Sequence, residues 1–322
     1  MSIKSEAYQG VVVPMVTPIT KNGKIDEKSA IKLIDFLYDN KAIPFILGTT
    51  GEAASIPSVE RHRLIQILID TKRNGTPAIT GMIGLTVPDT IAEANKFLKK
   101  GIDAIVVTLP YHYELTDTQI YNYYKYLADH IEGDIILYNI PKTVNQSIPI
   151  NIIEELSYQK NIIGIKDSEL DEERLVQSLH LWKDRKDFFH FTGVNALMPE
   201  GLNLGSKGIV PATANFVPCD YVSLYTASKE GKKDKVKKIF HQTVVYSELY
   251  QKGRTLGESL AALKFIMSEM DLCPSHVMPP ITDLADSEKI GIRNFIEKYG
   301  LEKMRIDISD DQTELFSDMK NG

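Results

Sequence analysis

Short runs of apolar, often β-branched residues alternate along this chain with stretches in which apolar residues recur at helical spacing. An apolar run without polar alternation predicts a strand buried on both faces, as in a parallel sheet, and the helix that follows predicts a right-handed crossover. Strands are expected at residues 11–17, 44–47, 77–81, 104–108, 134–139, 162–166, 188–193 and 208–210. Eight strand–helix units predict an α/β protein, a closed (β/α)8 TIM barrel.

The helices between these strands are expected at residues 27–40, 58–73, 88–100, 118–131, 171–182 and 195–204, with a short one after Pro149. Ser58 is placed to cap the second helix. A barrel of this class takes about 250 residues, and the chain has 322. We therefore expect the barrel over residues 1–230, a C-terminal helical extension over 231–304 and a loosely ordered, acidic polar tail over 305–322.

Composition excludes several classes of partner. The net charge of −6, with no Lys/Arg block, argues against nucleic-acid binding. No stretch of about eighteen apolar residues and no N-terminal apolar segment predicts a membrane span or a secretory signal. The two cysteines allow one disulfide at most, which favours a reducing cytoplasm.

In a barrel, reactive groups are expected where the strands end, on one rim. The residues at these ends are Thr17, Thr49, Thr50, Thr108, Tyr138, Lys166, Gly193 and Thr213. This set of hydroxyls around one amine does not include the two facing carboxyl groups that glycoside hydrolysis needs. The seven histidines never fall at metal-ligand spacing, and no glycine-rich phosphate loop follows a strand. We therefore expect neither a metal nor a cofactor.

Lys166 follows the buried run Ile162–Ile165. Burial disfavours the charged form of an amine, and a neutral amine is a nucleophile that can attack a ketone and form an iminium ion. Tyr138 ends the preceding strand, so its phenol could carry protons for that reaction. The alternative is structural: Lys166 would be a solvated strand end paired with Asp167, and Tyr138 a packed ring with a wet hydroxyl.

The segment Gly48-Thr-Thr-Gly-Glu52 closes the second predicted strand. Its two hydroxyls and the amides of a glycine-flanked turn could form a pocket for a carboxylate. In the alternative interpretation, it is a tight strand-to-helix connection whose threonines satisfy local backbone groups.

Five motifs together resemble the dihydrodipicolinate synthase/N-acetylneuraminate lyase family of pyruvate-type class I aldolases, from about residue 8 to residue 300. They are Gly10-x-x-x-Pro14-x-x-Thr17-Pro18, Gly48-Thr-Thr-Gly-Glu52, Tyr138-Asn-Ile-Pro141, Gly164-Ile-Lys-Asp-Ser168 and Thr213-Ala-Asn215. The resemblance implies that Lys166 is the Schiff-base lysine, Tyr138 the proton shuttle and Thr49 its relay partner. It also implies that Thr50 and the Gly51 amide hold the carboxylate of a 2-oxo acid. Gly193 and Val210 would line the pocket with their backbones, and the enzyme would be a homotetramer built as a dimer of dimers.

Two departures from the family bear on the relay and the substrate. His112 stands where a neighbouring subunit is expected to supply a relay tyrosine, and Tyr111 or Tyr113 could substitute. Thr143 stands where dihydrodipicolinate synthases carry an arginine, and the adjacent Lys142 lacks its bidentate fork. We therefore expect cleavage or dehydration of a 2-keto-3-deoxy sugar acid or a related 2-oxo acid.

Three alternatives to that activity stay open. Two are enzymes of the same family, a dihydrodipicolinate synthase and an N-acetylneuraminate lyase, although the lyases usually have serine at the place of Thr49. The third is a non-catalytic barrel that senses a 2-oxo acid and regulates a partner.

Overall fold

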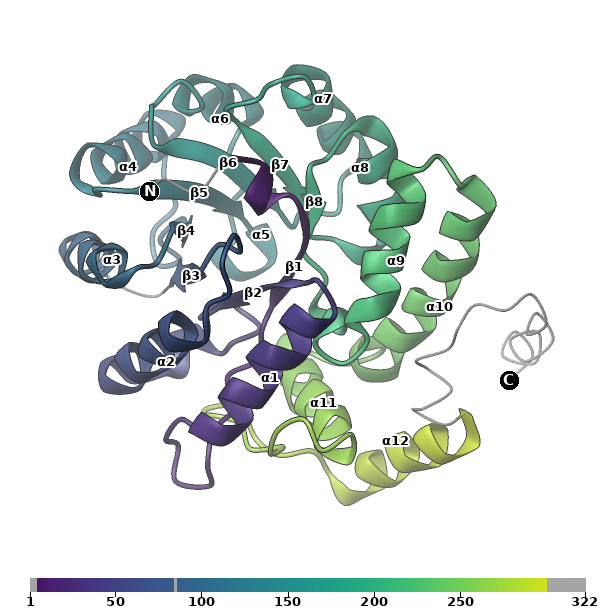
Figure 1. Cartoon of the computed structure of the whole chain (residues 1–322). Helices are drawn as coiled ribbons and strands as arrows, with labels where there is room; N and C mark the ends of the chain where they lie inside the picture. The colour runs from purple at the N-terminus through teal and green to yellow at the C-terminus, as the bar shows by residue number, and fades with distance from the viewer. Residues whose placement is uncertain (1–4, 84–85, 300–322) are drawn as a thin grey trace. The chain divides into compact units, whose positions relative to one another are not determined.

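The computed structural model describes residues 5–83 and 86–299, and its centre is a closed barrel of parallel strands (Figure 1). The strands are β1 (Gly10–Pro14), β2 (Ile43–Ile46), β3 (Ile79–Met82), β4 (Ala104–Thr108), β5 (Asp134–Asn139), β6 (Ile162–Asp167), β7 (Phe189–Thr192) and β8 (Gly208–Ile209). Each strand pairs with the next in the chain, and β8 closes on β1 through Gly10 opposite Gly208. The predicted fold class is confirmed.

Helices lie between successive strands, and in Figure 1 they surround the barrel. They are α1 (Glu27–Asp39), α2 (Ser58–Thr71), α3 (Val87–Lys100), α4 (Asp117–His130), α5 (Pro141–Val144), α6 (Ile150–Leu156), α7 (Glu172–Trp182), α8 (Met198–Leu204) and α9 (Pro218–Lys229). Further along the chain come α10 (Lys233–Gln251), α11 (Leu256–Glu269) and α12 (Asp286–Tyr299). Short 3₁₀ helices are Ser5–Tyr8, Ala53–Ser55, Asn195–Leu197 and Ala212–Asn215.

Three local predictions need correction. Pro57, not Ser58, precedes α2, and the Ser58 hydroxyl donates to Glu93 Oε1 (2.8 Å) instead of capping the helix. The helix expected over residues 195–204 is a 3₁₀ turn followed by α8, with a proline in the first turn of α8. β1 ends at Pro14 rather than at residue 17, and the Val16 amide donates to Asn215 Oδ1 (2.9 Å) instead of to a neighbouring strand. The Thr17 hydroxyl donates to the Gly51 carbonyl (2.6 Å).

Apolar side chains fill the barrel interior. Its buried cluster includes Val12, Phe45, Ile79, Ala104, Val106, Ile136, Tyr138, Phe189, Phe191 and Val210. β-Branched and aromatic residues suit a pleated surface that is buried on both sides, which explains why the strands lack a polar alternation. No helix in the described part of the chain is long and apolar enough to cross a membrane.

The described chain through Leu284 forms one compact unit, which includes α10 and α11 as well as the barrel. Within it, α10 packs against α9 and α11. α12 belongs to a second unit that begins at Ala285. The subdomain expected over residues 231–304 stays a prediction, and the tail at 305–322 lies outside the described residues.

Candidate active site

Lys166 lies near the carboxyl end of β6, directly opposite Tyr138 of β5 and Phe191 of β7. Its residue surface is only 5% exposed. The Nζ atom lies 3.9 Å from the centroid of the Tyr138 ring and 5.1 Å from that of Phe45. Among the described residues, no carboxylate or other acceptor binds this amine, so the structural alternative of a Lys166–Asp167 pair is not observed.

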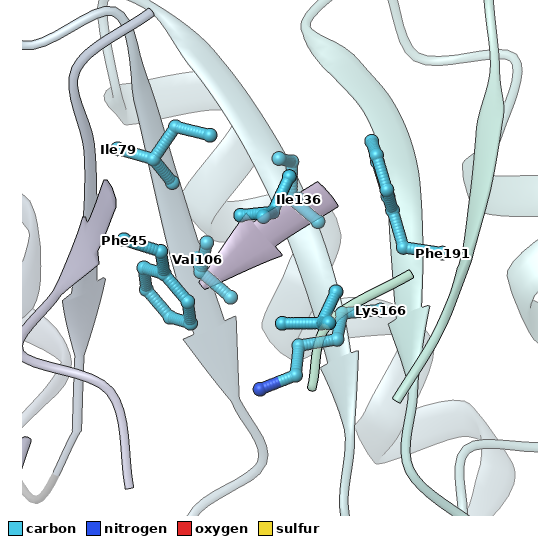
Figure 2. Close-up of a pocket in the computed structure, with 8 residues that line it drawn as sticks. Phe45, Ile79, Val106, Ile136, Lys166 and Phe191 are labelled. Carbon is cyan, nitrogen blue, oxygen red and sulfur yellow. The ribbon is translucent and has the colours of Figure 1, made fainter. Parts of the chain in front are cut away.

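Beneath the amine is a pocket with an apolar lining. Figure 2 shows the Lys166 side chain with Ile136, Val106 and the ring of Phe45 around it. The complete lining is Val12, Phe45, Ile79, Val106, Ile136, Lys166, Phe191 and Val210. Lys166 is therefore the single ionisable residue of this lining, on the rim side of the barrel core.

Tyr138 and Thr49, which are far apart in the sequence, come together beside the lysine. The Tyr138 phenol oxygen lies 3.4 Å from Thr49 Oγ1, and either hydroxyl can donate. The Tyr138 residue is 3% exposed, because its ring belongs to the barrel cluster. Two hydroxyls thus lie within hydrogen-bond reach of each other, beside the ring that the amine contacts.

Two backbone amides of the Gly48–Glu52 turn are not engaged in hydrogen bonds among the described residues. The amides of Thr49 and Thr50 have no acceptor among the described residues, and both side chains are half-buried. Gly51 differs from the expectation: its amide donates to the Gly48 carbonyl (3.1 Å) within the turn. The open donors for an anion are therefore those of Thr49 and Thr50. Glycine is favoured at 51 because a Cβ there would lie only 3.0 Å from the Met15 carbonyl oxygen.

Gly193 directly follows β7, which pairs with the lysine strand β6, and Val210 directly follows β8, which pairs with β7. The Gly193 amide donates to the Asp167 carbonyl (2.7 Å), and a Cβ at 193 would lie 2.9 Å from that same oxygen. Only glycine allows this close approach of two strand ends. The Val210 side chain lines the pocket beneath Lys166, while its amide donates to the Thr192 carbonyl (2.9 Å).

His112 lies on the loop between β4 and α4, away from the relay. It is exposed, and its ring packs against Tyr113 with centroids 5.0 Å apart. Tyr111 and Tyr113 are 61% and 70% exposed. Among the described residues, no hydrogen bond or ring contact joins these three aromatic residues to Tyr138 or Thr49.

Two other rim hydroxyls form hydrogen bonds within the fold. Thr17 binds the Gly51 carbonyl, and Thr213 Oγ1 lies 3.0 Å from the Tyr250 phenol oxygen of α10. In the described part of the chain, no group of His, Cys, Asp or Glu side chains is arranged to hold a metal ion.

Behind the relay lies a polar network that sequence reasoning missed. Asn139 and Asp167 directly follow Tyr138 and Lys166, face each other in register, and are joined by an Nδ2 to Oδ1 hydrogen bond (2.8 Å). Arg174 of α7 donates from Nε to Asp167 Oδ2 (2.7 Å). This network could have been predicted from the sequence. Successive strand residues point to opposite faces, so the polar residues that follow Tyr138 and Lys166 must face outward.

Comparison with known proteins gives the same family as the sequence motifs. The model of the dihydrodipicolinate synthetase family matches residues 7–299. A 4-hydroxy-tetrahydrodipicolinate synthase of Thermosipho africanus is 30% identical over 274 residues, which cover 82% of this chain and 92% of the relative. A second protein of that name, from Coxiella burnetii, is 26% identical over 297 residues, covering 91% of this chain and 99% of the relative.

Two solved structures share the fold over nearly the whole chain. Dihydrodipicolinate synthase from Bacteroides thetaiotaomicron has a TM-score of 0.85 and 25% identity, covering 90% of this chain and 98% of that one. YagE, a prophage protein of the dihydrodipicolinic acid synthase family from E. coli K12, solved with pyruvate, has a TM-score of 0.83 and 25% identity, covering 92% and 99%. This chain therefore belongs to the dihydrodipicolinate synthetase family and is an enzyme of the class I, lysine Schiff-base, aldolase and lyase type.

Proposed function

We propose that Lys166 forms a Schiff base with a pyruvate-type 2-oxo acid, and that the enzyme cleaves or dehydrates a 2-keto-3-deoxy sugar acid or a related compound. The observation that carries this proposal is the buried Lys166 amine, which has no carboxylate partner and lies 3.9 Å from the ring of Tyr138. An ion pair with a carboxylate would hold the Lys166 amine in its charged form. No described residue forms such a pair with Lys166.

The chemistry follows from this geometry. The Lys166 amine, in its unprotonated form, attacks the C2 carbonyl, and the carbinolamine loses water to give an iminium ion. For cleavage, a base removes the proton of the C4 hydroxyl, the C3–C4 bond breaks, and its electron pair is delocalised into the iminium as an enamine while an aldehyde leaves. Tyr138, relayed by Thr49, supplies and accepts these protons. The Thr49 and Thr50 amides bind the carboxylate next to C2.

The preference for a sugar acid rests on the residues after β5. Thr143 of α5 turns its hydroxyl back onto the Ile140 carbonyl (3.3 Å), and Lys142 is exposed. Neither residue offers the bidentate guanidinium that would hold the carboxylate of a second charged substrate. A neutral, hydroxyl-bearing aldehyde half suits this surface better than aspartate semialdehyde.

A second candidate is condensation of pyruvate with aspartate semialdehyde. It is favoured by the names of the curated relatives, which are 4-hydroxy-tetrahydrodipicolinate synthases. Both candidates begin with the same imine on Lys166, so they differ only in the second half of the reaction.

We also propose a homo-oligomer, in which one of the exposed residues Tyr111, His112 and Tyr113 completes the relay of a neighbouring subunit. This accounts for three adjacent aromatic side chains that find no place in their own chain's site. A cytoplasmic location is part of the proposal, and Cys219 and Cys273 do not form a disulfide with each other.

Borohydride trapping tests the shared step. The protein is incubated with pyruvate and reduced with borohydride, and the adduct is located by peptide mass spectrometry. A stable pyruvyl adduct on Lys166, absent from a folded Lys166→Met variant, supports the proposal. An unmodified mass for the folded wild type would refute it. Pyruvate release from a panel of sugar acids, and condensation with aspartate semialdehyde, then separate the two candidates.

A further inference from the structure

A buried ion pair joins the Gly48–Glu52 turn to helix α11. Lys264 Nζ forms an ion pair with Glu52 Oε1, and the two side chains are 1% and 0% exposed. The same ammonium donates to the His276 carbonyl (2.7 Å), and Glu52 Oε2 accepts the Met278 amide (2.6 Å). A carboxylate from the site turn is thus bound on both oxygens by the segment between Lys264 and Met278.

The backbone at Glu52 is held in an unusual conformation. Its φ is 55°, in the left-handed region, which is strained for a residue with a Cβ, and Leu47 has a φ of 54° at the other side of the turn. Such strain persists only where the surroundings fix it. The Lys264 ammonium and the Met278 amide provide that fixation at Glu52.

Glu52 is connected to the site through Thr49. The Glu52 amide donates to the Thr49 carbonyl (3.1 Å), and the Thr49 hydroxyl lies 3.4 Å from the Tyr138 phenol oxygen. The peptide groups that the turn leaves open, those of Thr49 and Thr50, lie between these two fixed points.

We propose that Glu52 and Lys264 are positioning residues, which hold the turn in the shape that binds the substrate carboxylate. Helix α11 would then contribute to the site through Lys264, although none of its side chains touches the reacting atoms. The inference rests on the proposed function, because it assigns the turn to the carboxylate of the 2-oxo acid.

A second ion pair offers a matched control. Lys72 Nζ lies 2.5 Å from Asp103 Oδ2, and that oxygen also accepts the Ala78 amide (2.7 Å). Both side chains are largely buried, at 23% and 17% exposure, and they lie where β3 and β4 begin, at the opposite end of the barrel. The pair therefore resembles Glu52–Lys264 in chemistry, is more exposed, and lies far from the site.

The test compares two double variants, Glu52→Gln/Lys264→Met and Asp103→Asn/Lys72→Met. Removing both partners avoids leaving one buried charge unpaired, the usual cause of unfolding in single variants. Borohydride trapping is measured against pyruvate concentration. For Glu52→Gln/Lys264→Met, we expect the half-saturating pyruvate concentration to rise about 10-fold or more, the loss typical of a weakened hydrogen bond to a charged group. The extent of trapping at saturation should stay as in the wild type, because Lys166 is untouched.

The control double variant should keep the wild-type half-saturation. Glu52→Asp is the second test variant: it retains both charges, so it guards against loss of folding, but its shorter side chain cannot reach Lys264 and Met278 together. We expect its half-saturation to rise by a smaller factor. Folded Glu52 variants with wild-type half-saturation would overturn the positioning role while leaving the proposed function intact. A wild type that pyruvate cannot label would instead overturn the proposed function.

Discussion

The two ends of the barrel differ in whether selected polar groups are hydrogen-bonded within the fold. At the amino end, Asn161 before β6 donates to the carbonyls of Ala128, Ile131 and Gly133 (3.0, 3.1 and 3.4 Å). At the carboxyl end, the Lys166 amine and the Thr49 amide have no partner among the described residues. Polar groups that bind one another stabilise the fold, whereas groups left open near a cavity can bind a ligand. Changes at the two ends should therefore separate stability from activity.

The largest effect is expected from Tyr138→Phe at the carboxyl end. Loss of the phenol removes the proton shuttle and should slow turnover by about two to four orders of magnitude. The melting temperature should change little, because the ring stays packed and the hydroxyl makes one long contact to Thr49, at 3.4 Å. Steady-state pyruvate release and thermal unfolding measure the two quantities. Unchanged turnover would remove Tyr138 from the mechanism.

Asp220, in the first turn of α9, should make stability depend on pH. Burial raises the pKa of this carboxyl from 3.8 to about 7, and its Oδ2 has no hydrogen-bond partner in the described part of the chain. Between pH 4 and pH 7 the folded state then binds more protons than the unfolded state, so the free energy of unfolding falls as pH rises through this range. At about 1.4 kcal/mol per pKa unit, the upper limit of this loss is about 4 kcal/mol.

Asp220→Asn should abolish that dependence, as urea unfolding from pH 4 to pH 8 would show. Burial lowers the pKa of His190 to about 4, which gives the opposite slope, with stability lost as pH falls from 6.5. The difference between wild type and Asp220→Asn isolates the aspartate, since His190 is present in both. Parallel curves for the two proteins would contradict a raised pKa at Asp220.

Asn161→Ala tests the closed end of the barrel. Truncation leaves three backbone carbonyls without their donor, which should lower the free energy of unfolding by about 1–3 kcal/mol. The urea midpoint should fall with an unchanged m-value, and the half-saturating pyruvate concentration should stay that of the wild type. A change in half-saturation without a change in stability would break the distinction between the two ends.

The smallest effect is expected from Tyr8→Phe, also at the amino end. The Tyr8 phenol donates to Asp134 Oδ2 (3.2 Å), and the ring is buried, so phenylalanine keeps the packing and loses one hydrogen bond. We expect a loss of about 1 kcal/mol in the free energy of unfolding. Tyr126→Phe, on a half-exposed tyrosine of α4, is the matched control and should leave stability unchanged. Equal stability of both variants with the wild type would show that the Tyr8 bond contributes nothing.

The order of the strands and the place of Lys166 could be predicted because they depend on local patterns. Periodicity assigns each segment, and parallel neighbours place residues at the ends of successive strands on one rim, so Tyr138 opposite Lys166 followed directly. The role of the Gly51 amide could not be predicted in this way, because a five-residue motif does not specify which of its amides close the turn. The same holds for Ser58, whose hydroxyl binds Glu93 of α3 instead of the start of its own helix.

The sequence by itself determined the barrel, the rim and the identity of the amine, since these follow from residue type and spacing within single strand–helix units. Only the tertiary structure decided which groups stay open on that rim. Asp167 faces away from Lys166 and is bound by Arg174 of α7, and Lys264 of α11 forms an ion pair with Glu52. No pattern of spacing relates residues on such distant elements, because their contact exists only once the barrel has closed and the later helices have packed against it.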